Sequence, residues 1–149
     1  MRVLGIDFGE RRIGLALSDP TGNVAQPIAP ILRRRGKRPP IQTVLDRIAE
    51  HDVGEIVVGL PLSLEGEDTE WTRKVRDFAA KLATRAARPV HLVDERMTSV
   101  MAERTVRSMG LPRRERERKE RVDTAAAMLI LQLHLDRSRA RPLEGCEAE

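Results

Sequence analysis

The sequence predicts an α/β fold built on a five-stranded mixed sheet, with the first three strands antiparallel, the later strands parallel, and helices on both faces. Three observations lead to this prediction. Residues 3–9 alternate apolar with small or polar side chains, as a strand does, and residues 13–17 repeat the alternation after a short turn. Further along, short apolar segments alternate with amphipathic ones, which is typical of right-handed strand–helix–strand connections.

The first third of the chain is predicted to form a hairpin, an edge strand and a helix. Gly9 follows the first strand, where the backbone must turn or let a ligand approach closely. Residues 24–32 predict a third strand, and Pro27 and Pro30 favour the edge of the sheet for it. We expect Gly54 to be the break after the helix. The apolar residues of that helix fall on one face: Ile41, Val44, Leu45, Ile48 and Ala49.

The middle of the chain is predicted to hold two buried strands separated by a helix. Residues 55–61 predict a fully buried strand, parallel to the first. Residues 62–68 form a loop, and residues 90–93 form the next buried strand. The helix between them presents one apolar face made of Trp71, Val75, Phe78, Ala79 and Leu82.

The last third of the chain is predicted to be helical with a charged interruption. A third helix runs from near Ser99 to Gly110, and residues 111–121 form a solvated segment or the exposed first turns of another helix. Residues 1–136 are expected to form one domain, and residues 137–149 a frayed or disordered tail. The apolar face of the last helix should pack on the sheet: Val122, Ala125, Ala126, Leu129, Ile130 and Leu133.

Composition limits the partners and the cellular location. The 149 residues carry a net charge of +4, and the sequence pI of about 10.0 is consistent with a polyanionic partner. Aromatic residues make up only 2%, so a nucleic acid would be read through phosphates and shape rather than by base stacking. One cysteine, Cys146, excludes an intrachain disulfide framework. No apolar run reaches the roughly 18 residues of a membrane span, and Met1 leads straight into a strand rather than a signal peptide. We therefore expect a cytoplasmic protein that does not associate with a membrane.

Three acids are placed to meet at the carboxyl ends of the strands: Asp7, Glu95 beside Asp94, and Asp123. Two carboxylates about 4 Å apart repel by roughly 4 kcal/mol at an effective dielectric constant of 20, so such a group needs protons or cations. Two Mg²⁺ or Mn²⁺ ions about 3.5–4 Å apart would suit phosphodiester hydrolysis. The alternatives are that Asp7 caps a turn, that Glu95 pairs with Arg96 or another basic residue, and that Asp123 interacts with a helix dipole.

Basic residues flank these acids in the sequence. The candidate phosphate ligands are Arg33, Arg34, Arg35, Lys37, Arg38, Arg96, Arg113 and Arg114. A charge run is also the ordinary composition of a solvated surface, above all in residues 113–121, where Glu115, Glu117 and Glu120 can form helical ion pairs. The three histidines look isolated, and His91 is interpreted as a satisfied strand residue rather than a ligand.

Four segments together resemble the signature blocks of the YqgF (RuvX) family of Holliday-junction-resolvase-like proteins. They are Gly5-Ile6-Asp7-Phe8-Gly9, Val57-Val58-Gly59-Leu60-Pro61-Leu62, Asp94-Glu95-Arg96-Met97-Thr98-Ser99 and Val122-Asp123-Thr124-Ala125-Ala126. The resemblance covers about residues 1–136 and implies an RNase H-like nuclease domain. It also implies maturation of the 5′ end of 16S rRNA precursor in the bacterial cytoplasm, or cleavage of a four-way DNA junction. Asp7, Glu95 and Asp123 match the acidic positions of the family.

This chain differs from the better-known resolvases at the end of the fourth strand. Those proteins carry an acid there, whereas this sequence has Gly59-Leu60-Pro61, so the second acid must come from Glu95. The metal site is therefore expected to be sparser, and the activity weaker or dependent on a partner such as a ribosomal precursor particle.

Two other function classes are consistent with parts of the sequence. Residues 5–9 and the hairpin after them also resemble the first phosphate loop of actin-like and sugar-kinase ATPases, but those enzymes need a second such domain. A noncatalytic RNA-binding ribosome-assembly factor would use the basic loops alone and would not need three convergent carboxylates. A homodimer would suit a two-fold substrate, although the sequence shows no dimer interface.

Overall fold

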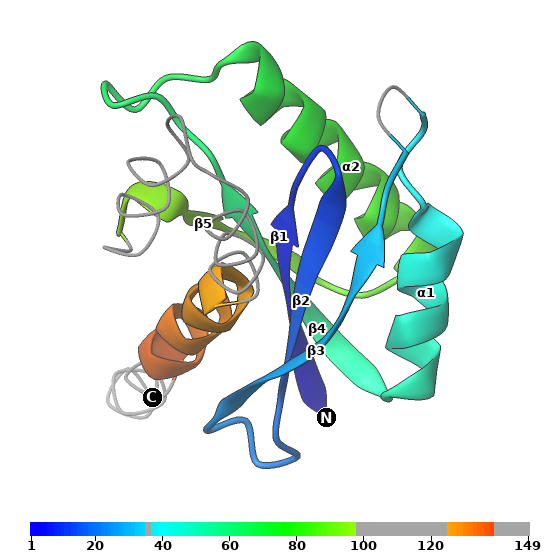
Figure 1. Ribbon diagram of the computed structural model, residues 1–149. Coiled ribbons are helices and arrows are strands. Elements are labelled where there is room, and N and C mark those ends of the chain that lie inside the picture. Colours follow the sequence, from blue (N-terminus) through cyan, green and yellow to red (C-terminus); the bar gives the residue numbers. More distant parts are fainter. Residues whose placement is uncertain (35–36, 98–124, 139–149) are drawn as a thin grey trace, which may run out of the picture.

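The computed structural model describes residues 1–34, 37–97 and 125–138, and within them it has a five-stranded mixed sheet (Figure 1). A helix at residues 125–138, here named the C-terminal helix, ends the described chain. The predicted fold class is confirmed. The other elements are β1 (Arg2–Phe8), β2 (Arg12–Ser18), β3 (Ala25–Leu32), α1 (Ile41–Glu50), β4 (Val53–Leu60), α2 (Glu70–Ala86), β5 (Val90–Asp94) and the 3₁₀ turn η1 (Glu95–Met97).

The strand order is β3-β2-β1-β4-β5, which puts β1 in the middle of the sheet and β3 at one edge, as predicted. β2 pairs antiparallel with both β1 and β3, while β4 lies parallel to β1 and β5 lies parallel to β4. The tight turn between β1 and β2 requires Gly9, because a Cβ there would lie 2.5 Å from the carbonyl oxygen of Arg12. Because β4 and β5 run parallel to β1, the carboxyl ends of these three strands lie at the same end of the sheet.

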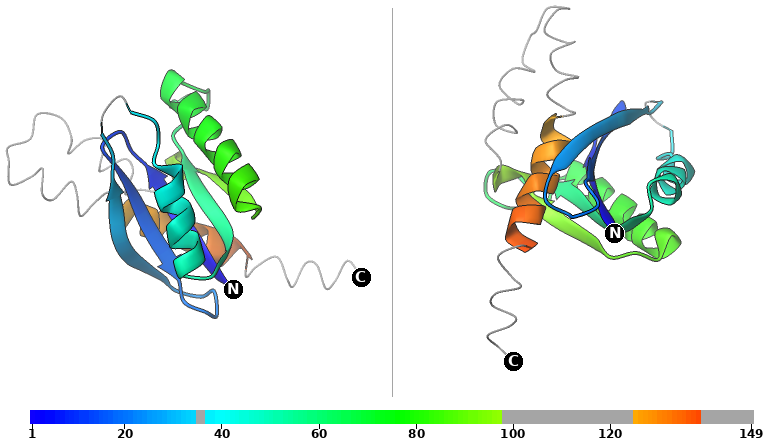
Figure 2. Two further views of the ribbon diagram at one scale, coloured as in Figure 1. Left: turned by 90° about the vertical axis from the view of Figure 1, so that its right-hand side faces the viewer. Right: turned by 90° about the horizontal axis from the view of Figure 1, so that it is seen from below.

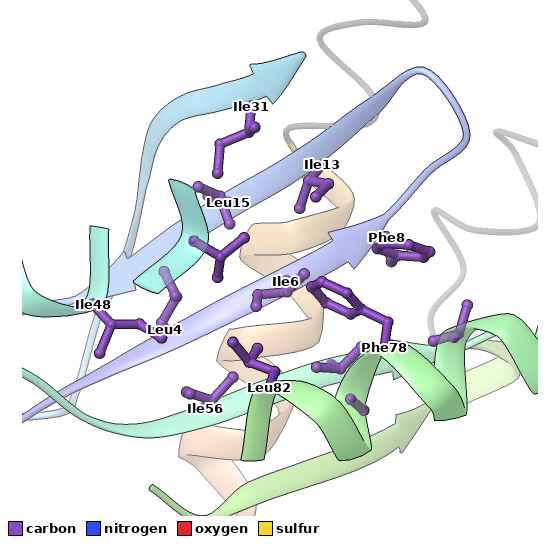
Figure 3. Packing of buried hydrophobic residues seen from close by; sticks show 14 of the residues in the cluster. Leu4, Ile6, Phe8, Ile13, Leu15, Ile31, Ile48, Ile56, Phe78 and Leu82 are labelled. Carbon is purple, nitrogen blue, oxygen red and sulfur yellow. The ribbon is translucent and has the colours of Figure 1, made fainter. Parts of the chain in front are cut away.

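Helices α1 and α2 cover one face of the sheet and the C-terminal helix covers the other (Figure 2). Figure 3 shows the core under α1 and α2, where Leu4, Ile6 and Phe8 of β1 meet Phe78 and Leu82 of α2. The rings of Phe8 and Phe78 stack with their centroids 4.3 Å apart. α2 begins at a capping box between Thr69 and Thr72, which fixes its first turn against the β4–α2 loop.

The C-terminal helix lies unusually close to β1 and β4. A Cβ on Gly5 would stand 2.7 Å from Cβ of Leu131 and 3.0 Å from the carbonyl oxygen of Ala127. The helix buries small and apolar residues against this face of the sheet: Ala126, Ala127, Ile130, Leu131 and Leu135. Glycine in the central strand therefore sets the depth at which the helix packs.

Three details differ from the sequence-based expectations. Gly54 lies inside β4, and the chain instead turns at Asp52, whose φ is 53°. Residues 90–93 are not fully buried: β5 is an edge strand, only Val93 of it is buried, and Leu92 is 40% exposed. The buried face of the C-terminal helix is wider than the predicted one: Ala126 and Ile130 are buried and Leu133 packs beside them as expected, but Leu131 and Leu135 are buried as well.

Some expectations fall on other parts of the chain. The predicted helix from Ser99 to Gly110, the charged residues 111–121 and the tail from residue 139 lie outside the described residues. Within the described ranges, none of the helices combines the length and the apolar character needed to cross a membrane.

Candidate metal-binding carboxylate site

Asp7 occupies the end of the central strand and is only 5% exposed. Its neighbours Ile6 and Phe8 point into the core under α1 and α2 (Figure 3). Because side chains alternate along a strand, Asp7 faces the other side of the sheet, which the C-terminal helix covers. A rigid strand between two neighbours thus holds a buried carboxylate at the carboxyl end of the sheet.

Glu95 follows β5 directly, in η1, and is 8% exposed. Val93, two residues earlier, packs in the cluster under the C-terminal helix. The side chain of Glu95 lies over Gly59 of β4, since a Cβ on Gly59 would stand 2.7 Å from Oε1 and 3.1 Å from Cγ of Glu95. The same Cβ would stand 2.5 Å from Cδ1 of Ile130 on the C-terminal helix.

Strand register brings the two acids together. Ile6 pairs with Val58 and Gly59 pairs with Val93, so one further step of the first pairing sets Asp7 beside Gly59. Neighbouring strands lie about 4.8 Å apart, and the Glu95 carboxylate occupies the place that a side chain on Gly59 would take. Asp7 and Glu95 therefore converge across about one strand spacing on the same face.

Gly59 is the residue of this site that sequence reasoning missed. The fourth strand was expected to leave the site short of one acid, but its missing side chain is what makes room for Glu95. A glycine at the carboxyl end of a buried strand, next to an acid on the neighbouring strand, is a signal that could have found it. The third predicted acid, Asp123, lies outside the described residues, two positions before the first described residue of the C-terminal helix.

The donor set fits a hard divalent cation. Asp7 and Glu95 offer only carboxylate oxygens, which are the ligands that Mg²⁺ and Mn²⁺ prefer over imidazole or thiolate. Both side chains are nearly buried, so holding them together as anions without a counter-charge would be costly. Asp7 of β1 and Glu95 of η1 could therefore hold one side of a divalent cation.

Arg96 braces the strand end that carries Glu95. Its guanidinium pairs with Asp94, with Nη2 2.6 Å from Oδ2, and its Nη1 donates to the carbonyl oxygen of Leu64 at 3.2 Å. The hydrogen bond from Arg96 lowers the pKa of the Asp94 carboxyl and raises the pKa of Arg96 itself. Arg96 thus ties the end of β5 to the β4–α2 loop.

Arg33 is partly buried and makes contacts within the protein. Its guanidinium lies 4.5 Å from the centroid of the Phe8 ring, and its Nη1 donates to the carbonyl oxygen of Gly9 at 2.6 Å. Burial lowers the pKa of Arg33, and its Nε is buried without a hydrogen-bond partner among the described residues. Arg33 therefore holds the β1–β2 turn next to Asp7.

The other predicted phosphate ligands are spread over the surface. Arg34, Lys37 and Arg38 are exposed. Arg38 lines a pocket of about 770 Å³ with Lys81 and Arg85, on the side of the sheet that α1 and α2 cover. Arg35, Arg113 and Arg114 lie outside the described residues.

Fold and site together define a class of protein. A mixed sheet in the order β3-β2-β1-β4-β5, with helices on both faces, has the RNase H-like arrangement. The chain belongs to the RuvX family, since the model of that family, described as "Holliday junction resolvase", matches residues 1–137. The resemblance recognised from the four sequence blocks is confirmed.

Relatives of this chain match along most of their own length and carry the name "Putative pre-16S rRNA nuclease". The relative from Maridesulfovibrio salexigens is 46% identical over 138 residues, which are 93% of this chain and 100% of the relative. The relative from Nocardioides sp. is 49% identical over 142 residues, 92% of this chain and 88% of the relative.

A solved structure supports the fold. T. thermophilus RuvC in complex with a Holliday junction substrate is similar with a TM-score of 0.54 and 15% identity, over 93% of this chain and 96% of that chain. At this level of identity the likeness concerns the fold, and it confirms the predicted RNase H-like sheet.

Proposed function

We propose that this chain is a metal-dependent nuclease that processes the 5′ end of 16S rRNA precursor. One observation carries the proposal: two nearly buried carboxylates, Asp7 and Glu95, converge beside Gly59 at the carboxyl end of the sheet. The names of the relatives support precursor rRNA as the substrate. Such a reaction belongs in the cytoplasm, on ribosomal precursor particles.

Asp7, Glu95 and Asp123 would hold a pair of Mg²⁺ or Mn²⁺ ions. When bound, these ions would activate the attacking water and stabilise charge on the leaving oxygen. Asp7 is fixed by the central strand and cannot move without disturbing the core, so it suits the position shared by both ions. Glu95 is oriented by η1 and by the Arg96–Asp94 pair beside it.

The basic residues would bind the substrate phosphates around these acids. Arg34, Lys37 and Arg38 are exposed for such contacts, and Arg35, Arg113 and Arg114 are proposed from the sequence alone. Arg33 and Arg96 keep part of their surface accessible, but their hydrogen bonds suit them for holding the loops that face the substrate. With so few aromatic residues, the substrate would be recognised by shape and backbone.

A four-way DNA junction is the second candidate substrate. The description of the family model and the Holliday junction in the similar RuvC structure favour it. A junction with two-fold symmetry would also favour a homodimer. A noncatalytic RNA-binding assembly factor is the alternative in which the carboxylates have no chemical role.

The deciding experiment is a cleavage assay on precursor rRNA and on a four-way junction, with Mg²⁺, with Mn²⁺ and after chelation of metal. We expect cleavage of the precursor RNA only with metal, and its loss in Asp7→Asn, which keeps the size of the side chain but removes its charge. Asp77→Asn is the matched control, because Asp77 is exposed on α2 and pairs only with Lys81 among the described residues. Full metal-dependent cleavage by Asp7→Asn would exclude this site.

A further inference from the structure

A second group of side chains that could hold a metal ion lies at the opposite end of the same sheet face. Nε2 of His91 on β5 is 2.6 Å from Oε1 of Glu55 on β4, and Nε2 of His134 on the C-terminal helix is 3.0 Å from the same oxygen. The two imidazole rings are stacked with centroids 4.9 Å apart. Three elements distant in the sequence thus aim one ligand atom each at a common point.

The topology explains why these residues meet. His91 pairs with Val57 in the parallel β4–β5 ladder, and Glu55 precedes Val57 by two residues, so both side chains face the C-terminal helix. His134 follows Ile130 and Leu131 by about one helical turn, at the end of the helix away from Asp7. The cluster is therefore separate from the carboxylate site, near the start of the strands rather than at their ends.

The geometry suits a cation with tetrahedral coordination. The three ligand atoms lie within 4.8 Å of one another. Zinc bound at about 2.0–2.2 Å from nitrogen and oxygen keeps its ligand atoms about 3.3–3.5 Å apart, so the observed contacts would need to open by less than about 1 Å. Two histidines and one glutamate are also a common set of three protein ligands for zinc, with water in the fourth position.

Burial and access are suited to uptake from solution. The His134 side chain is 10% exposed, while those of His91 and Glu55 are 41% and 34% exposed. One ligand is thus nearly buried and two are partly exposed to solvent, so an ion can reach the site without unfolding. Ser138 lies 3.5 Å from Nε2 of His134 and completes the polar rim on the helix side.

We propose that Glu55, His91 and His134 form a zinc site that fastens the edge strand β5 and the C-terminal helix to β4. The imidazole-rich ligand set selects Zn²⁺ over Mg²⁺, whereas the carboxylate-only set of Asp7 and Glu95 has the opposite preference. The ordinary alternative is a metal-free hydrogen-bonded cluster, in which both imidazoles share one carboxylate oxygen. The two possibilities differ in one measurable property, the stoichiometric binding of Zn²⁺.

The test uses the full chain freed of metal with a chelator. Zn²⁺ is titrated in excess Mg²⁺ by calorimetry, and Co²⁺ is used as a spectroscopic probe of tetrahedral coordination. We expect one equivalent of Zn²⁺ to bind, to raise the melting temperature, and to displace Co²⁺ with loss of its visible absorption. No stoichiometric binding by the wild-type chain would overturn the proposal.

Three variants identify the ligands and separate this proposal from the nuclease site. His91→Asn changes a half-exposed ligand, and should weaken Zn²⁺ binding by about 100-fold or more, which exceeds the usual effect of removing a hydrogen-bond partner of a metal ligand. His51→Asn, at a histidine outside the cluster, should bind Zn²⁺ as the wild type does. Asp7→Asn should also keep Zn²⁺ binding, whatever happens to cleavage; loss of binding in Asp7→Asn with retention in His91→Asn would put the ion in the carboxylate site and overturn the proposal.

Discussion

The two ends of the sheet face under the C-terminal helix have the same architecture but opposite ligand chemistry. At the carboxyl end of the strands, Asp7 and Glu95 offer only oxygen, and Gly59 on β4 leaves space for Glu95. At the other end, Glu55 lies under two stacked imidazoles. The same three elements, β4, β5 and the helix, border both groups of side chains.

This difference teaches how one scaffold can keep two cations apart. In the two proposed sites, hard ions would select the carboxylate end and borderline ions the histidine end, so neither ligand set would need to exclude the other ion by shape. The shared helix makes the two ends mechanically dependent, because its depth is set by glycine in the central strand. Substitutions at single positions can therefore disturb one end, both ends, or only the loops beside them.

The largest effect is expected from Gly59→Ala, which should damage the carboxylate end alone. The new Cβ would overlap the Glu95 carboxylate and Cδ1 of Ile130, and displacement of a catalytic group by about 1 Å can cost roughly 100-fold in rate. Cleavage assays should show this loss while calorimetry shows unchanged Zn²⁺ binding. Gly54→Ala in the same strand is the control, since there the three nearest atoms all belong to the side chain of Met1, a terminal residue that is 81% exposed.

Gly5→Ala should disturb both ends at once. Its Cβ would press on Leu131 and on the backbone of Ala127, so the helix must move, at a cost of about 1–3 kcal/mol typical of an overpacked core. Urea unfolding should report the lower stability, and both cleavage and Zn²⁺ binding should weaken. A destabilised variant with both activities intact would contradict the idea of a shared helix.

Comparing Arg33→Gln with Arg34→Gln should show which arginine near the carboxylate end stabilises the fold and which one binds the substrate. Loss of the contact with Phe8 and of the hydrogen bond to Gly9 should lower the free energy of unfolding by about 1 kcal/mol. Arg34→Gln, at an exposed position, should change stability by less than about 0.5 kcal/mol.

If Arg34 contacts a phosphate, Arg34→Gln should reduce the slope of the logarithm of the nucleic-acid binding constant against the logarithm of salt concentration. The reduction should be about 0.7 for single-stranded nucleic acid and about 0.9 for duplex DNA. An unchanged slope would leave Arg34 as a solvated residue.

The smallest effect concerns the β2–β3 turn at the histidine end. Hydrogen bonds from the Thr21 hydroxyl and from the backbone of Val24 and Asn23 lower the pKa of Asp19 to about 2, against 3.8 for a free side chain. A lowered pKa in the folded state means that this stabilisation is complete above pH 3.8 and is lost as the pH falls through about 2. An NMR titration should find this pKa, and Asp19→Asn should remove the corresponding pH dependence of stability. A titration midpoint of Asp19 near 3.8 would show that these hydrogen bonds do not stabilise the β2–β3 turn.

Local patterns explain what the sequence predicted well. The alternation of Leu4, Ile6 and Phe8 and the helical face of α2 each depend on neighbours within a few residues, and both predictions are confirmed. The central position of β1 followed from the hairpin and the handedness of the later connections. Asp7 was correctly predicted to lie at the carboxyl end of a central strand.

What the sequence could not predict depends on contacts between distant segments. Glu55 and His134 are 79 residues apart, and their meeting requires both the strand register and the rotation of the last helix. The prediction found only part of the buried face of that helix, because residues 129–135 carry apolar side chains on more than one face. The burial of β5 was overestimated for a similar reason: an apolar run does not reveal whether a strand has one neighbour or two.

The prolines of β3 have a consequence for how copies of this molecule can associate. Pro27 and Pro30 remove two backbone donors from one edge strand, and the irregular register between β2 and β3 bends it. The opposite edge is β5, which is only five residues long and has its histidine turned toward the helix. Among the described residues, neither edge of the sheet offers a long, regular row of hydrogen-bonding groups, so we expect edge-to-edge pairing of sheets from different copies to be disfavoured. Any two-fold pairing of copies across a symmetric substrate would then be built from side chains rather than from a continuous sheet.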